Sequence, residues 1–280
     1  MSGQQTRLRA ALVQMTATTR LAENARLCAA AIRQAASGGA QFVSLPEVAN
    51  LAQLDREKAF SQACPEARDP CLAACRELAA ELNIWVHVGS CVIRPEGADY
   101  LVNRAFVIDG GGEIRARYDK IHMFDVDLEN GESYRESALF RAGNEAVLVR
   151  SPWGGLGLTI CYDLRFPALH RALAAAGAEI LLNPASFTRP TGRAHWRTLL
   201  TARAIETGSF VLAAAQCGTH EDGRQTWGHS LAVSPWGEVL AEAGEDPCVT
   251  LVDLDLNLAA AARRAIPALR AAQSFTLREA

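Results

Sequence analysis

The sequence lacks any long block of one charge: its 28 Lys+Arg and 31 Asp+Glu residues are scattered over 280 positions. A nucleic-acid-binding arm or an acidic solvating tail would need such a block, so neither is expected. The chain also has no run of ~18 apolar, uncharged residues that could span a bilayer. Its start, MSGQQTRLRAALVQM, has no apolar core of the signal-peptide kind. These absences predict a cytoplasmic protein without nucleic-acid or membrane partners.

Metal-binding patterns are missing as well. The eight cysteines include no CxxC pair and no Cys/His spacing typical of a zinc site, and there is no HExxH motif or compact ligand cluster. We therefore expect reduced thiols and no metal. A metal-dependent hydrolase is the weakest of the functional alternatives.

Hydrophobic residues make up 49% of the chain, which is ample for a large core. Strand-like and helix-like segments occur twice in the same order. The first series is strand 8–15, helix 21–36, strand 41–45, helix 69–82, strand 84–90 and a hairpin over 103–118. The second series is strand 156–160, helix 167–176, strand 180–182, helix 195–206, strand 210–215 and a hairpin over 231–241.

The two series also resemble each other in their letters. GGAQFVSLPE at 38–47 parallels AGAEILLNPA at 176–185, and FVIDGGGEI at 106–114 parallels LAVSPWGEV at 231–239. Each half would form a sheet with one helix layer, and each sheet needs its second face covered. We therefore predict an α/β fold, a four-layer α-β-β-α sandwich with an internal pseudo-twofold repeat. Residues 141–155 read as loop and turn rather than linker, so residues 1–280 are expected to form one domain.

The stretch LTICYDLRFP places Cys161 where an apolar strand ends and a helix follows. Most free cysteines are buried packing residues, and that is the bland interpretation. A sharp turn from strand to helix can instead expose a nucleophile, and the amide groups at the helix start would favour its thiolate. The residues alone leave the partner base of such a nucleophile open, because no histidine stands in a recognisable context.

Two further strand ends carry polar residues, Glu47 and Asn183. Ligands bind beyond the carboxyl ends of strands in open α/β sheets, so both are expected near Cys161. Partial burial would raise the pKa of Glu47 toward a useful value, although an isolated Pro-Glu is more often a solvated loop. Lys120 is either a fixed positive charge for an oxyanion or a surface lysine paired with a neighbouring aspartate. The context of Glu136 indicates nothing further.

Four motifs, SLPEVAN, YDKIHMFDVD, GESYRES and LTICYDLRFP, occur in the order and at the distances typical of a known family. With these motifs the chain resembles the nitrilase superfamily of carbon-nitrogen hydrolases over nearly its full length. The resemblance implies an α-β-β-α sandwich that forms homodimers or higher homo-oligomers and needs no cofactor. It implies Cys161 as nucleophile, Glu47 as general base, Lys120 at the oxyanion, and Glu136 as an assistant to the lysine or to proton transfer.

The segment AAAQCGTHEDGRQTWGHS resembles the deaminated glutathione amidases of the Nit-type branch, whereas omega-amidases usually differ there. This resemblance implies hydrolysis of a small-molecule amide through a thioester, releasing 2-oxoglutarate and cysteinylglycine from deaminated glutathione. An omega-amidase acting on 2-oxoglutaramate and an N-carbamoyl amino acid hydrolase remain alternatives, as does a non-catalytic binding protein. Departures from the family pattern, such as Ser44, Val48 and Met123, concern the pocket rim.

Candidate substrate contacts lie at and beyond the nucleophile motif. Tyr162 adjoins Cys161, and its backbone N–H is expected to help hold an oxyanion. The other candidates are Asn183, Phe187, Arg189, Thr191 and Trp196. For those downstream of Asn183, a solvated loop or a helix face is an equally good interpretation.

Overall fold

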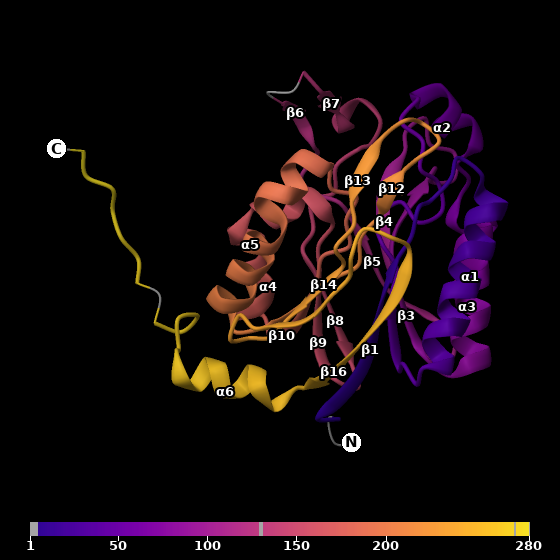
Figure 1. Cartoon of the computed structure of the whole chain (residues 1–280). Helices are drawn as coiled ribbons and strands as arrows, with labels where there is room; N and C mark the ends of the chain where they lie inside the picture. The colour runs from indigo at the N-terminus through magenta and orange to yellow at the C-terminus, as the bar shows by residue number, and fades with distance from the viewer. Residues whose placement is uncertain (1–4, 129–130, 272, 280) are drawn as a thin grey trace.

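A computed structural model describes residues 5–128, 131–271 and 273–279. Two six-stranded sheets lie face to face, with helices on their outer sides (Figure 1). The first sheet has the order β16 (Cys248–Asp255), β1 (Arg7–Gln14), β2 (Phe42–Ser44), β3 (Trp85–Ile93), β4 (Val102–Ile108) and β5 (Ile114–Asp119). The second has the order β15 (Val239–Glu242), β14 (Leu231–Val233), β11 (Phe210–Ala213), β10 (Ala178–Leu182), β9 (Gly154–Leu158) and β8 (Val147–Ser151).

Helices cover both outer faces (Figure 1). The helices α1 (Leu21–Ser37) and α3 (Pro70–Leu82) cover the first sheet, and α4 (Pro167–Ala175) and α5 (Arg189–Thr207) cover the second. Smaller elements are α2 (Arg56–Gln62), α6 (Asn257–Ala265), the hairpins β6 (Asp125–Asp127) with β7 (Ser133–Arg135) and β12 (Cys217–Thr219) with β13 (Gln225–Trp227), and short 3-10 helices at Glu66–Arg68, Glu136–Ala138 and Cys161–Arg165. No helix among the described residues is long and apolar enough to cross a membrane.

The alternation of side chains along β1 shows how the layers are held together. Leu8, Ala10 and Leu12 belong to the core between the two sheets, whereas Ala11 and Val13 belong to the core under α1 and α3. Period-two alternation in a strand buried on both faces places apolar residues on each side. The predicted four-layer α-β-β-α sandwich is confirmed. Each sheet has three adjacent parallel strands, β1-β2-β3 and β9-β10-β11, with antiparallel strands on both sides of them. The predicted pseudo-twofold rotation stays a prediction.

Local sequence explains where α3 begins and ends. The Asp69 side chain accepts a hydrogen bond from the N–H of Leu72 and caps α3, with Pro70 at the first helical position. Both residues suit a helix start, because the cap satisfies a free amide and proline loses none that the helix needs. Asn83 ends α3 in the left-handed conformation at φ 50°, which asparagine tolerates better than most residues.

Two strands were not predicted, and several predicted boundaries were wrong. Residues 141–155 contain the strand β8, which pairs antiparallel with β9, and β16 pairs with β1 in the same way. Edge strands of this kind are poorly marked in sequence, because only one neighbour and one face constrain them. The helix predicted at 195–206 begins at Arg189, since Pro190 fits its first turn. The strand predicted to end at 160 leaves the ladder after Leu158.

Candidate active site

Side chains that follow three strands meet at one cavity of about 360 Å³. Glu47 follows β2, Lys120 follows β5, and Cys161 follows β9, and all three line the cavity. Glu136 lines it from the 3-10 helix after β7. Each of the four catalytic candidates therefore lies on the same cavity, although 114 residues separate Glu47 from Cys161 in the sequence.

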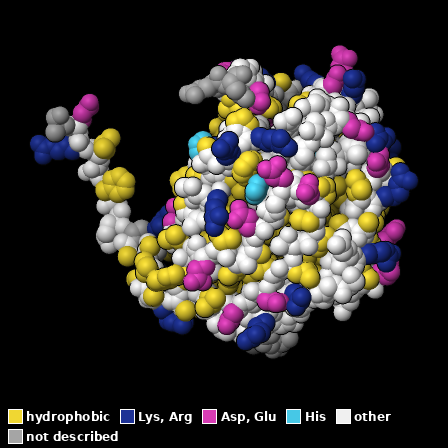
Figure 2. Space-filling view, viewed as in Figure 1, with side chains coloured by type: hydrophobic (Ala, Val, Ile, Leu, Met, Phe, Trp, Pro, Cys, Tyr) yellow, Lys and Arg dark blue, Asp and Glu magenta, His cyan; other side chains and the backbone are white. Residues whose placement is uncertain are grey.

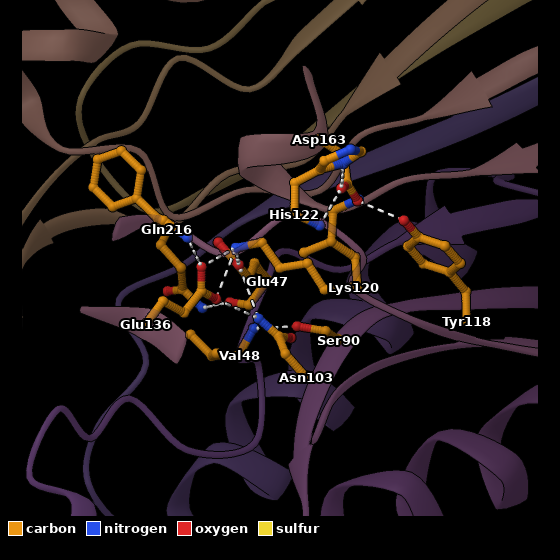
Figure 3. Close-up of polar contacts among 12 residues, drawn as sticks. Glu47, Val48, Ser90, Asn103, Tyr118, Lys120, His122, Glu136, Asp163 and Gln216 are labelled. Carbon is orange, nitrogen blue, oxygen red and sulfur yellow. Dashed lines mark hydrogen bonds and ion pairs between the residues drawn. The ribbon is translucent and has the colours of Figure 1, made fainter. Parts of the chain in front are cut away.

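A buried ion network holds the lysine between two carboxylates (Figure 3). Lys120 Nζ donates to Glu47 Oε1 at 2.8 Å and to both oxygens of Glu136 at 2.8 Å. Asn103 Nδ2, from β4, also donates to Glu47 Oε1 at 3.0 Å and to Glu136 Oε1 at 3.3 Å. The ammonium is only 1% exposed, so the two carboxylates supply the charge that makes its burial tolerable.

Burial and neighbouring charge act in opposite directions on this network. Burial lowers the pKa of Lys120, but the carboxylates of Glu136 and Glu47 outweigh it, and the pKa lies well above the ordinary value. The pKa of Glu136 is raised by burial and by the negative charge of Glu47, against the opposing effect of Lys120. Lys120 is therefore a permanent cation that faces the cavity.

The backbone around Glu47 is fixed by its neighbours. Val48 adopts φ 50°, a left-handed conformation that a β-branched residue rarely takes. Its N–H donates to Ser90 Oγ at 2.8 Å, and Gln216 Nε2 donates to the carbonyl of Glu47 at 2.9 Å (Figure 3). Strain of this kind persists where surrounding contacts determine the conformation, and it is common at functional sites. The turn holds the Glu47 side chain against Lys120.

Cys161 lies on a turn of the same strained type. Its φ is 51°, and its N–H donates to the carbonyl of Pro184 at 2.9 Å. The helix that follows directly is a 3-10 helix of five residues, Cys161–Arg165, and α4 begins only at Pro167. The chain thus first forms a tight turn around Asp163, and the helix predicted at 167–176 follows it as α4.

The buried carboxylate of Asp163 holds this turn in place through hydrogen bonds. Its Oδ2 accepts from Tyr118 Oη at 2.7 Å and from the N–H of Ile160 at 2.8 Å. Its Oδ1 accepts from the N–H of His122 at 3.1 Å and lies 2.7 Å from His122 Nδ1 (Figure 3). Residues 118, 122 and 163 were not predicted as site residues, since their sequence contexts are ordinary. Asp163 sets the path of the backbone on which Cys161 stands.

The electrostatic environment of Cys161 contradicts one expectation. Burial and the adjacent Glu47 carboxylate raise the pKa of the thiol well above its ordinary value, and Lys120 opposes them only in part. The predicted preference for the thiolate is therefore wrong. The short 3-10 helix has little dipole to offset burial and the negative charge of Glu47.

The candidate substrate contacts divide into two groups. Tyr162, Phe187 and Thr191 line the cavity. Asn183, Arg189 and Trp196 do not line it. Asn183 Oδ1 accepts from Thr159 Oγ1 at 2.8 Å inside the second sheet, and Arg189 is exposed.

Trp196 supports the wall from behind rather than forming it. Its Nε1 donates to the carbonyl of His229 at 2.7 Å, and its ring lies 4.9 Å from that of Phe187. The helical register of α5 therefore turns Trp196 inward to the core, where it is 1% exposed.

Several polar residues of the cavity wall were missed. Ser133, Tyr134 and Arg135 stand in the GESYRES motif, Asn103 lies on β4, and the others lie in loops or turns: Gln53, Ser186, Thr188 and Arg224. No histidine lines the cavity among the described residues, which agrees with a carboxylate as the base. Asn103 lies on a mid-sheet strand, and its polarity within an apolar segment is the one feature of the sequence that could have predicted a role at the site.

One group of side chains with metal-ligating atoms lies elsewhere. The ligand atoms of Asp69, Cys71 and Cys91 lie within 4.8 Å of one another, so the expectation of no compact ligand cluster was wrong. The group joins the start of α3 to β3, a proximity that only the fold creates. None of the three lines the cavity, and the Asp69 carboxylate already caps α3 and accepts from Asn50 Nδ2 at 2.7 Å.

The model of the carbon-nitrogen hydrolase family matches residues 9–264. The chain belongs to the carbon-nitrogen hydrolase family. The expectations of a nitrilase-superfamily member and of an enzyme are thereby confirmed. This hydrolase is 40% identical over 237 residues to the deaminated glutathione amidase of Yersinia enterocolitica, spanning 84% of this chain and 82% of that protein.

Solved structures agree with this assignment. The NitFhit protein of C. elegans superposes with a TM-score of 0.89 at 35% identity, covering 98% of the hydrolase and 66% of that longer chain. The chain thus spans slightly less than two thirds of NitFhit. A mutant of the amidase from Nesterenkonia sp. AN1 superposes with a TM-score of 0.78 at 28% identity, covering 92% and 94%, and shows covalent addition of the acetamide moiety of fluoroacetamide at its active-site cysteine.

Proposed function

We propose that this hydrolase cleaves the amide bond of deaminated glutathione through a thioester on Cys161. The observation that carries the proposal is the meeting of Cys161, Lys120 and Glu47 on one cavity, each at the end of a different strand. A nucleophile needs a base and an oxyanion site within reach, and these three residue types provide them. The covalent adduct on the cysteine of the Nesterenkonia amidase supports the choice of nucleophile.

In the first half of the reaction, Glu47 takes the thiol proton as the sulfur attacks the amide carbonyl carbon. Lys120 Nζ and the backbone N–H of Tyr162 donate to the oxyanion that forms. The N–H groups of Cys161 and Asp163 are already bonded to the carbonyls of Pro184 and Ile160, which leaves that of Tyr162 for this role. The carbon–nitrogen bond then breaks, Glu47 gives its proton to the leaving nitrogen, and a thioester remains.

In the second half, water replaces the amine. Glu47 takes a proton from the water, whose oxygen attacks the thioester carbon, and Lys120 and the Tyr162 amide again hold the oxyanion. The carbon–sulfur bond breaks, the sulfur regains a proton, and the acid departs. The high pKa of the thiol fits this scheme, because a thiol that keeps its proton until substrate arrives needs an adjacent base. Glu136 positions Lys120 through its paired contacts.

The choice of substrate rests on the relatives. The curated relative named above is a deaminated glutathione amidase, and the match spans most of both chains. Tyr162, Phe187 and Thr191 provide an aromatic and hydroxyl wall beside Cys161 for the acyl chain. The expected products are 2-oxoglutarate and cysteinylglycine.

The test compares hydrolysis of deaminated glutathione and 2-oxoglutaramate by the wild type, by Cys161→Ala and by Cys248→Ala. Cys248 is an exposed cysteine on β16, so its variant is the matched control. We expect the wild type and the control to prefer deaminated glutathione, and Cys161→Ala to lose at least about 10³-fold in kcat. A thioester is then sought by mass spectrometry after acid quenching.

Two outcomes would overturn separate parts of the proposal. A preference for 2-oxoglutaramate would keep the mechanism and replace the substrate by that of an omega-amidase. Full activity of Cys161→Ala on either substrate would remove the cysteine mechanism.

We also propose that the protein forms a homodimer. Hydrophobic side chains gather over α6 on the face shown in Figure 2. Ile205, Trp236, Leu258 and Ile266 are 54%, 59%, 45% and 57% exposed, and such a contiguous apolar surface favours a protein partner. Light scattering is expected to give the mass of two chains, and Trp236→Arg should shift it toward one. A wild type of single-chain mass at all concentrations would contradict the dimer.

A reducing compartment such as the cytoplasm is the proposed location. All eight cysteines are free thiols, and thiols persist where disulfides do not form. The denatured protein, isolated from its host with alkylation at lysis, should show no disulfide-linked peptides; abundant disulfides would contradict this location.

A further inference from the structure

Three cationic side chains line the cavity, and they differ in whether they have a partner. Lys120 is held by two carboxylates. Arg135 forms an ion pair with Asp127 at 2.8 Å and donates to the carbonyl of Tyr134 at 2.7 Å. Arg224 has no ion pair within the described part of the chain, and its buried Nε has no hydrogen-bond partner there.

The backbone that carries Arg224 is well anchored. Arg224 stands in the turn between β12 and β13, where its N–H donates to Asp222 Oδ1 at 3.1 Å and its carbonyl accepts from the N–H of His220 at 2.8 Å. The neighbouring Glu221 accepts from the N–H of Thr19 at 2.9 Å. Asp222 Oδ1 is engaged by the backbone N–H of Arg224, and Asp222 Oδ2 has no hydrogen-bond partner among the described residues, so Asp222 does not pair with the guanidinium. The turn is therefore fixed while the guanidinium is left without an anion.

A cationic side chain that lines a cavity and has no acceptor in the protein can bind an anionic group of the ligand. Guanidinium groups bind carboxylates in a planar, paired geometry, and a buried donor left unpaired is unfavourable. Arg224 is half-buried, so its partner is held partly out of water, where such a bond is stronger than on an open surface. The expected ligand group is a carboxylate.

We infer, resting on the proposed function, that Arg224 binds the glycine carboxylate of the cysteinylglycine leaving group and so selects deaminated glutathione. Deaminated glutathione carries two carboxylates, one on the 2-oxo acid part and one on the glycine. 2-Oxoglutaramate carries only the first and releases ammonia. A cation dedicated to the glycine carboxylate therefore separates the two substrates.

The position of Arg224 in the sequence supports this assignment. It belongs to residues 213–230, the segment that carries the resemblance to the deaminated glutathione amidases. The fold brings this segment to the cavity that holds Cys161. Thr226 bridges to Thr188, and Trp227 packs against Gly192, where even a Cβ would approach the indole within 2.3 Å. The hairpin is thus joined to the start of α5, beside the cavity wall.

The test measures kcat/KM of wild type, Arg224→Met, Arg224→Lys and Arg135→Met on three probes. These are deaminated glutathione, its glycinamide analogue, which lacks the second carboxylate, and 2-oxoglutaramate. On deaminated glutathione, Arg224→Met should lose about 10- to 100-fold, mainly through KM, since one charge-assisted hydrogen bond of a bound ligand is removed. Arg224→Lys should recover part of the loss.

On the glycinamide analogue and on 2-oxoglutaramate, Arg224→Met should stay within about threefold of the wild type, because the partner carboxylate is absent. Arg135→Met, which removes a cavity cation that already has a partner, should not change the ratio between substrates. Circular dichroism of each variant verifies that it is folded.

An equal loss on all three probes would overturn the inference and assign Arg224 to the 2-oxo acid carboxylate that the substrates share. No loss on deaminated glutathione would also overturn it. In both cases the wild type would still prefer deaminated glutathione. If the wild type itself prefers 2-oxoglutaramate, the proposed function fails instead, so the two failures are distinguishable.

Discussion

Cys161 and the thiol cluster, which we define as Cys28, Cys71, Cys75 and Cys91, are all buried. The cluster lies between α1, α3 and β3, and none of its members lines the active-site cavity. Contacts with the other three thiols hold the pKa of Cys71 well below its ordinary value, whereas the pKa of Cys161 is raised. Cys71 does not line the cavity, so a lowered thiol pKa does not by itself mark the nucleophile.

The difference between the two regions lies in the backbone and in the neighbouring charges. The cluster stands on regular helix and strand, and its side chains fill the space between layers. Cys161 stands on a turn at φ 51°, beside Glu47 and Lys120. Position on a cavity next to the proposed base, rather than an already low thiol pKa, distinguishes the proposed nucleophile. Three substitutions and one alkylation experiment test this comparison.

Glu47→Gln should have the largest effect. An amide at this position cannot accept a proton, so kcat should fall by about 10²–10⁴-fold. The matched control is Asp69→Asn, which alters the buried carboxylate beside the thiol cluster and should leave kcat within about threefold, because it touches no cavity residue. Steady-state kinetics with saturating substrate measures both. Wild-type kcat in Glu47→Gln would remove Glu47 as the base.

Asp163→Asn should weaken both the turn and the fold. Asp163 accepts four hydrogen bonds, and an asparagine NH₂ would face donors instead. We expect a loss of about 2–3 kcal/mol in the free energy of unfolding, because a charged acceptor is lost in the interior. Urea denaturation measures it, with the exposed Asp127→Asn as control, and kcat should fall as well. A variant with unchanged stability and kcat would show that the hydrogen bonds of Asp163 do not hold the Cys161 turn in place.

Alkylation with iodoacetamide should separate the two regions in the native state. Cys161 lines the cavity and should react, whereas the thiol cluster should react only after unfolding. The rate follows the thiolate fraction, and a raised pKa lowers that fraction at any given pH. The rate at Cys161 should therefore still increase above about pH 9, where an ordinary thiol levels off. Peptide mapping against pH measures it; a plateau near neutral pH would contradict the raised pKa.

Cys71→Ser should have the smallest effect, and it should act on stability alone. The hydroxyl replaces a thiol in a buried site with few oxygen partners, which costs about 1–3 kcal/mol. Activity per folded molecule should be unchanged. Urea denaturation and active-site titration test this, with Cys71→Ala to separate polarity from size. A large loss of kcat in the folded variant would mean that the cluster communicates with the active site.

The principal layers followed from local pattern. Apolar strands, alanine-rich helices and the second occurrence of the same order predicted the sandwich, because periodicity reports burial directly. β8 and β16 were missed, since an edge strand is defined by its neighbour rather than by its own residues. The short 3-10 helix after Cys161 was missed for a related reason, as its tight turn depends on a carboxylate that receives hydrogen bonds from distant residues.

The sequence by itself determined the residue types at three strand ends, because a strand that closes with Glu47, Lys120 or Cys161 places that side chain at the sheet edge whatever else is present. Only the tertiary structure decided which groups share a cavity. Asn103 joins Glu47 to Glu136, and Arg224 reaches the same cavity from a hairpin. Hydrogen bonds and Coulomb forces depend on distance in space, so the shifted pKa values and the unpaired Arg224 of this site exist only once the two sheets pack.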